Sequence, residues 1–147
     1  MKFCLGTAQF GSQYGLDKTY YKNIDSKFKN IIDWNRKNKF FKYIDTAYNY
    51  GKSERIIGKY LSQYDNLKII SKISFENNFT LDGLKINFYK SLNYLNKRKI
   101  YGLLIHDKSM FNKKKINSTL KFLDYIKKKK LVKKIGLSVY SRKELDK

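Results

Sequence analysis

Short apolar runs alternate along the chain with longer segments whose apolar residues recur at helical spacing. The runs are brief and almost continuously apolar, which is typical of strands in a parallel sheet that is buried on both faces. We expect such strands at residues 2–5, 43–45, 67–72, 101–105 and 133–137. Each run is followed by a loop and then by a longer amphipathic segment.

The longer segments place apolar side chains every three or four residues, which is the period of an amphipathic helix. We expect helices over residues 25–38, 53–62, 80–96 and 117–130. The side chains expected on their buried faces are Phe28, Ile31, Ile32 and Asn35, then Ile56, Ile57, Tyr60 and Leu61, then Leu84, Phe88, Leu92 and Leu95, and finally Leu120, Leu123 and Ile126.

Polar residues mark where helices begin. Asp25 and Thr80 are the expected N-caps of two helices, and residues 141–144 have the capping-box pattern that would open one more. Strands alternating with helices predict a parallel α/β sheet with right-handed crossovers. A doubly wound sheet and a (β/α)8 barrel both use such units, and periodicity alone does not choose between them.

The charge of the chain is strongly basic, with 33 Lys and Arg against 12 Asp and Glu and a formal net charge of +21. Such a charge can indicate binding to nucleic acid or to an anionic surface. However, Lys far exceeds Arg, Pro is absent, and the abundant Lys, Asn, Ile, Tyr and Phe all have A/T-rich codons. We therefore favour a coding bias over a functional basic surface, and expect no specific nucleic-acid partner.

Cysteine usage and hydropathy bear on location. A single cysteine, Cys4, excludes an internal disulfide and fits a reducing compartment. The opening apolar run is too short for a signal peptide, and no run approaches the roughly 20 residues of a membrane span. We expect a soluble, cytoplasmic protein with no membrane association.

Polar residues end three of the expected strands, and a fourth polar residue follows another strand. Asp45, Lys72 and His106 stand at three strand ends, and Ser138 directly follows a fifth strand. The carboxyl ends of parallel strands meet on one face, which holds the active site of a barrel. A charged side chain at the end of a buried strand is costly unless it is paired, so Asp45 and Lys72 are expected partners.

Each of these residues also has a simpler explanation. Asp45 alone suits a turn or helix cap, Tyr50 suits loop packing, and Lys72 is one lysine among many. The only histidine, His106, is more often structural than catalytic in such a position, and without a Cys/His cluster we expect no metal. Together they gain meaning, because an ammonium beside a tyrosine favours the phenolate and makes the phenol a usable general acid.

Four segments carry a resemblance to a known family. They are Gly-Thr-Ala-Gln-Phe-Gly at 6–11, Asp-Thr-Ala-Tyr-Asn-Tyr-Gly-Lys-Ser-Glu at 45–54, Ser-Lys at 71–72 and Leu-Ile-His at 104–106. The second motif is long and specific, and the others gain weight from their order and spacing. Over essentially all of its length, the chain resembles the aldo-keto reductases. Within the second motif, we expect Ser53 and Glu54 to serve the helix N-terminus, where negative charge is favoured.

The resemblance implies a (β/α)8 barrel and an NAD(P)H-dependent oxidoreductase that reduces an aldehyde, ketone or sugar to an alcohol. Tyr50 would donate a proton to the carbonyl oxygen, Lys72 paired with Asp45 would tune it, and His106 would orient the carbonyl. The implied cofactor is NADPH, with NADH as an alternative. The implied partner is a small-molecule carbonyl substrate.

The resemblance also implies residues close to the cofactor, namely Gly6, Thr7, Asp45 and Ser138. In the family, the loop after the fifth strand often has Gly-x-Ser-Asn, in which the Ser and Asn hold the nicotinamide carboxamide. Here the Ser is kept as Ser138 and the Asn is replaced by Val139. One of the two carboxamide contacts is therefore lost from the pattern.

Length separates this chain from the family, because such a barrel usually needs about 250 residues and the chain has 147. We expect a single partial domain over 1–147, the N-terminal half of a barrel through its fifth strand. Alone it should be inactive, bind NADPH poorly and self-associate through its open first and fifth strands. The competing hypotheses are a non-catalytic remnant or binding module of the same fold, and a basic nucleic-acid-binding protein whose affinity falls steeply with salt.

Overall fold

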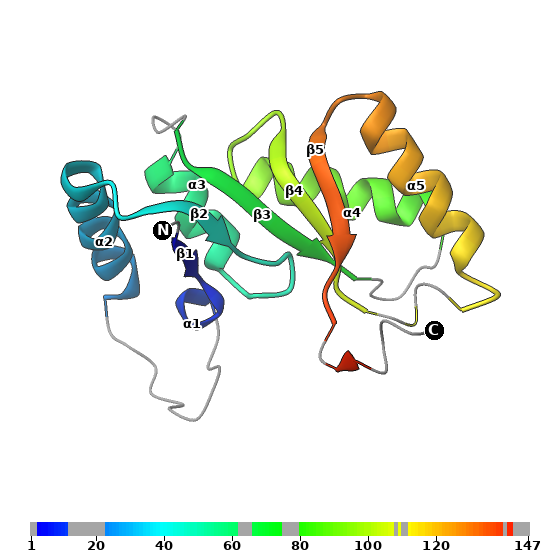
Figure 1. Cartoon of the computed structure of the whole chain (residues 1–147), viewed down its shortest axis with the longest axis horizontal. Helices are drawn as coiled ribbons and strands as arrows, with labels where there is room; N and C mark the ends of the chain where they lie inside the picture. The colour runs from blue at the N-terminus through cyan, green and yellow to red at the C-terminus, as the bar shows by residue number, and fades with distance from the viewer. Residues whose placement is uncertain are drawn as a thin grey trace.

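The computed structural model describes residues 3–11, 23–61, 66–74, 80–107, 109, 112–139 and 141–142. Strands and helices alternate along these residues (Figure 1). The elements are β1 (Phe3–Gly6), α1 (Ala8–Gly11), α2 (Ile24–Asn38), β2 (Phe41–Asp45), α3 (Ser53–Leu61), β3 (Lys68–Ile73), α4 (Leu81–Tyr94), β4 (Ile100–Ile105), α5 (Ile116–Lys128) and β5 (Val132–Leu137). All five expected strands and all four expected helices are confirmed within a few residues at their ends, and the short helix α1 is additional.

The strand order decides between the two architectures that the sequence left open. The sheet is parallel and runs β1-β2-β3-β4-β5, with each strand beside its successor. A doubly wound sheet reverses its order at a switch point, whereas a β/α barrel adds strands progressively in one direction. The structure is therefore an incomplete (β/α)8 barrel, as predicted, with β1 and β5 at the two edges of the sheet.

The core lies between the sheet and the helices that cover one of its faces. Helices α3 and α4 lie behind the strands in Figure 1, and α5 packs beside β5. Fully buried side chains from both layers form a single apolar cluster, and its largest members are Phe28, Phe88 and Phe122. The opposite face of the sheet, which would line the inside of a closed barrel, carries the pair of Asp45 and Lys72.

Two details of the expected helices are wrong. Asp25 is not an N-cap: Asn23 occupies that position, and Asp25 lies in the first turn, where it pairs with Lys59 of α3 at 3.0 Å. On α5, Leu120 is half exposed, while Phe122 is fully buried against Phe88. The larger ring fills the space between α4 and α5, which rotates the buried face away from Leu120. The Thr80 cap is confirmed, since its hydroxyl accepts from the Gly83 N–H at 3.0 Å.

The edge strands are less buried than the apolar runs predicted. Ile135 and Leu137 of β5 and Phe3 of β1 are all more than a third exposed. These strands have a neighbour on one side only, so burial on both faces fails for them. Half of the predicted capping box at 141–144 lies outside the described residues, since the described part of the chain includes 141–142 but not 143–144. In the described ranges, no helix is both long and apolar enough to cross a membrane.

Candidate active site

The expected site residues lie at the carboxyl end of the sheet, because the parallel strands all end there. Asp45 is the last residue of β2, Lys72 stands next to the end of β3, and His106 follows β4. The backbone N–H of His106 donates to Ile73 at 2.9 Å, and that of Ser138 donates to Ile105 at 2.9 Å. Sheet hydrogen bonding thus continues past the strand ends and fixes both of these positions.

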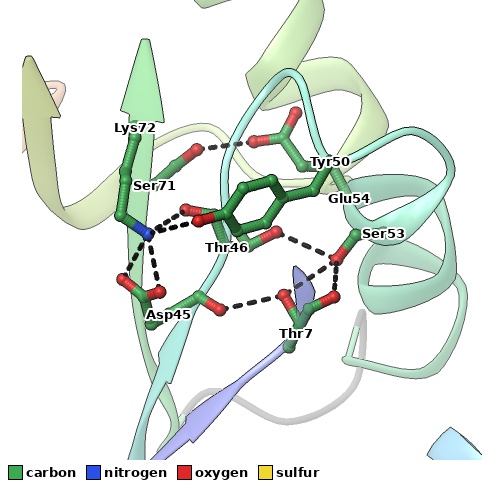
Figure 2. A network of polar contacts seen from close by, with 8 residues as sticks. All are labelled: Thr7, Asp45, Thr46, Tyr50, Ser53, Glu54, Ser71 and Lys72. Atoms are coloured by element: carbon green, nitrogen blue, oxygen red, sulfur yellow. Dashed lines mark hydrogen bonds and ion pairs between the residues drawn. The ribbon is translucent and has the colours of Figure 1, made fainter. Parts of the chain in front are cut away.

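Lys72 is the centre of the cluster. Its Nζ donates to both carboxylate oxygens of Asp45, at 2.6 and 2.8 Å, and lies 3.3 Å from the hydroxyl of Tyr50 (Figure 2). A fourth contact, at 3.3 Å, joins Nζ to the backbone oxygen of Thr46. The Lys72 side chain is only 8% exposed. A buried ammonium is stable when a carboxylate and further acceptors surround it, and this arrangement supplies both.

Tyr50 reaches the cluster from the loop between β2 and α3. The loop is tightly wound, since the Tyr50 N–H donates to Ala47 and the Ser53 N–H donates to Tyr50. Gly51 has φ +55°, a conformation that favours glycine. A Cβ on Gly51 would also lie 2.1 Å from the backbone oxygen of Gly11 at the end of α1. The two glycines therefore let the end of α1 pack directly against the Tyr50 loop. Gly11 is part of the first motif, but the sequence alone did not reveal this role.

The His106 ring contacts the ring of Tyr50 edge-on. The two ring centroids are 5.9 Å apart and the planes nearly perpendicular, at 82°. Partial burial, together with the nearby charge of Lys72, lowers the pKa of His106 below its ordinary value of 6.5. The imidazole is therefore neutral at neutral pH, with one nitrogen as a donor and the other as an acceptor.

A chain of hydrogen-bonded hydroxyl groups fixes the end of β2. Thr7 donates to the backbone oxygen of Asp45 at 2.9 Å, and Ser53 donates to the Thr7 hydroxyl at 2.8 Å. Thr46 lies 3.1 Å from Ser53, and because the Ser53 proton is already used, Thr46 is the donor there. Thr7, Thr46 and Ser53 are all fully buried. The hydroxyl of Thr7 thus holds the backbone of Asp45 in place.

Glu54 has a different place from the one expected. Its Oε1 accepts from Ser71 of β3 and from Ser91 of α4, each at 2.6 Å, and the residue is 2% exposed. Among the described residues, Oε2 has no hydrogen-bond partner. Burial raises the pKa of Glu54 to about 7, although the two serine hydrogen bonds oppose that rise. The carboxyl therefore ties α3 to β3 and α4 and does not act as an exposed charge at the helix N-terminus.

The Ser91 contact had a sequence signal that we did not use. Ser91 follows Leu84 by seven residues and Phe88 by three, which places it on the buried stripe of α4. A polar residue on a buried stripe needs a partner. The sequence does not say which polar residue lies close to Ser91 in the fold. The stripe could therefore reveal a buried serine but not its hydrogen bond to Glu54.

The remaining expected residues also stand at or just after the carboxyl ends of their strands. Gly6 ends β1 beside Asp45, and a Cβ placed there would meet nothing within 4 Å. Ser138 and His106 are half-buried at the ends of β5 and β4. Within the described ranges, no three His, Cys, Asp or Glu side chains are grouped to hold a metal.

An incomplete parallel barrel with a Lys-centred polar cluster at the carboxyl ends of its strands has the layout of the α/β-barrel class, whose active sites lie at that end. The model of the aldo/keto reductase family matches residues 2–147. The chain therefore belongs to the aldo/keto reductase family.

Solved structures agree in fold. An aldo-keto reductase of Pseudomonas aeruginosa is 25% identical with a TM-score of 0.76, and the match covers 92% of this chain and 54% of that one. The holo form of a Bacillus halodurans aldo-keto reductase is 19% identical (TM-score 0.72, 93% and 45% covered), and a Bombyx mori aldo-keto reductase in complex with NADP is 18% identical (0.72, 97% and 48%). The chain thus spans about half the length of these relatives. A comparison with curated proteins found no match.

Proposed function

We propose that this chain carries the proton-transfer machinery of a nicotinamide-dependent carbonyl reductase. The observation that supports this most strongly is the position of the buried Lys72 ammonium, in contact with both the Asp45 carboxylate and the Tyr50 hydroxyl. A structural ion pair would need Asp45 and Lys72 alone. The phenol of Tyr50, 3.3 Å from the ammonium, adds a group that can donate a proton. The positive charge of Lys72 then stabilises the phenolate that is left.

The proton donor is Tyr50. Its hydroxyl gives a proton to the oxygen of a bound aldehyde, ketone or sugar carbonyl, and the Lys72 ammonium stabilises the phenolate that is left. Asp45 keeps the ammonium in place and balances its charge. His106, neutral at physiological pH, donates an N–H hydrogen bond to the same carbonyl oxygen and so orients it.

The residues at this edge fit a nicotinamide group. The space beside Gly6 is unobstructed, and the Ser138 hydroxyl has the donor and acceptor capacity that a carboxamide needs. When bound, NADPH or NADH supplies the hydride that the carbonyl carbon accepts. Gly6 and Ser138 are the residues that would hold the nicotinamide end, while Thr7 acts indirectly by fixing Asp45.

The test needs a closed barrel. We define the extended protein as this chain joined to the part of the Pseudomonas aeruginosa relative beyond the matched region. The extended protein should oxidise NADPH in the presence of a panel of aldehydes, ketones and sugars, and Tyr50→Phe should lower kcat by about 10²–10⁴-fold. The 147-residue chain alone should show no such activity.

Two outcomes would count against the proposal. One is a folded Tyr50→Phe variant, checked by circular dichroism, that reduces carbonyls at the rate of the parent. The other is a folded extended protein that binds NADPH but reduces none of the compounds, which would favour the non-catalytic binding module instead.

A further inference from the structure

A group of positively charged side chains lies at the opposite end of the strands from the Lys72 cluster. A cavity of about 760 Å³ opens there between the starts of β3, β4 and β5. Its positively charged lining residues are Lys68, residues 97–99, Lys127, Lys130 and Lys133. Among the described residues that line it, none is acidic. In Figure 1 the α4–β4 and α5–β5 connections, which supply most of these residues, lie side by side at the top of the view.

Overall composition does not account for this clustering. Lys and Arg are 33 of the 147 residues of the chain but seven of the twelve that line the cavity. A coding bias would spread the lysines in proportion to exposed surface. Three chain segments that are distant in sequence instead bring their positive charges to one hollow, and only the fold places them together.

Helix ends at this location offset little of the charge. The C-termini of α4 and α5 point toward the cavity, and each contributes a partial negative charge of about half an elementary charge. Some of the lysines have local partners: the Lys127 ammonium donates to the backbone oxygen of Lys133 at 3.0 Å, and Lys68 lies 4.7 Å from the Tyr101 ring centroid. Neither a carbonyl nor a ring neutralises a full charge, so the hollow keeps a strong positive potential that favours anions.

The floor of the cavity differs from its rim. Ile69, Ile100 and Val132 are buried apolar lining residues, and the Tyr101 ring, which also lines the cavity, contacts Lys68. The volume falls within the range of about 300–1,000 Å³ that is usual for small-molecule sites. A compact ligand with several phosphates would match the rim, and an aromatic or apolar part on it would match the floor.

We propose that this cavity binds a small polyphosphorylated molecule. The site is separate from the catalytic one, since Lys68 and Lys72 lie four residues apart on β3, or about 13 Å along a strand. The two sites lie at opposite ends of the same strands. Adenosine triphosphate and inorganic tripolyphosphate are suitable probes, because they share the phosphate chain and differ in the aromatic part.

The experiment is isothermal titration of the 147-residue chain with each probe. Lys99→Glu/Lys133→Glu reverses two exposed charges at the rim, and Lys37→Glu/Lys121→Glu reverses two exposed charges on the outer faces of α2 and α5. The rim variant should weaken both probes by at least about tenfold, and the matched variant by less than about twofold. The triphosphate with its base should bind more tightly than tripolyphosphate. Lys99→Gln/Lys133→Gln, a milder change, should give an intermediate loss.

Equal weakening by the rim and matched variants would overturn the proposal, because it would show a general charge effect. Binding of neither probe by a chain that circular dichroism shows to be folded would overturn it as well. A single-stranded oligonucleotide that binds tighter than both probes, with no loss in the rim variants, would replace the cavity with a nucleic-acid surface elsewhere on the chain.

Discussion

Two acidic residues of one motif, Asp45 and Glu54, have opposite surroundings. Asp45 lies on the open face of the sheet and contacts the Lys72 ammonium, whereas Glu54 lies on the helix-covered face and accepts hydrogen bonds from two serine hydroxyls. Their partners, Lys72 and Ser71, are neighbours on β3, and consecutive side chains of a strand point to opposite faces of the sheet. The motif therefore holds an ion pair on one face of the sheet and a packing contact on the other.

Of the two acidic residues, Asp45 should have the larger effect on stability, because its loss leaves the Lys72 ammonium without a counter-charge. Asp45→Asn removes the carboxylate from a buried ammonium, and breaking such a pair typically costs about 3–5 kcal/mol. Urea unfolding of the extended protein at neutral pH should show a free energy of unfolding lower by about this amount. Lys72→Met/Asp45→Asn should recover a large part of the loss, since no charge is left unpaired. If the double variant is as unstable as the single one, Asp45 does not act by compensating Lys72.

Glu54 should affect stability through pH. Its pKa rises from 4.5 in the unfolded chain to about 7 in the fold. Between these values the unfolded chain loses its proton while the folded chain keeps it, so stability falls as pH rises through this window. The full fall is about 3 kcal/mol and is complete above about pH 7.

Glu54→Gln keeps the oxygen that accepts from Ser71 and Ser91 but cannot ionise. The free energy of unfolding of the extended protein is measured at about pH 5 and at about pH 8. The decrease between these two pH values should be smaller in this variant, because Glu54 no longer contributes to it. The variant should gain on its parent at the higher pH and not at the lower. Parallel pH profiles of the two proteins would show that Glu54 is not held neutral by burial.

The fold was largely predictable because strand and helix periods are local signals. The runs ending in Asp45, Lys72 and Ile105 predicted which residues share an edge, since parallel strands end together. Strand order was not predictable from periodicity, because it depends on which strands pair. The surroundings of Glu54 were hidden for a related reason: a residue in the first turn of a helix looks like a helix-end charge until the position of the neighbouring helix is known.

The proposed function depends on the action of Lys72 on Tyr50 in proton transfer. The direct test is the pH dependence of kcat/KM for carbonyl reduction by the extended protein, compared among the parent, Lys72→Met and Lys68→Met. Lys68 is a matched control, because it lies on the same strand and faces the Tyr43 and Tyr101 rings instead. Without the ammonium, the phenolate that forms as the proton leaves is no longer stabilised, so Lys72→Met should lower kcat/KM across the whole profile, while Lys68→Met should leave the profile in place. A Lys72→Met profile that coincides with the parent's, or an equal loss in both variants, would contradict the claim.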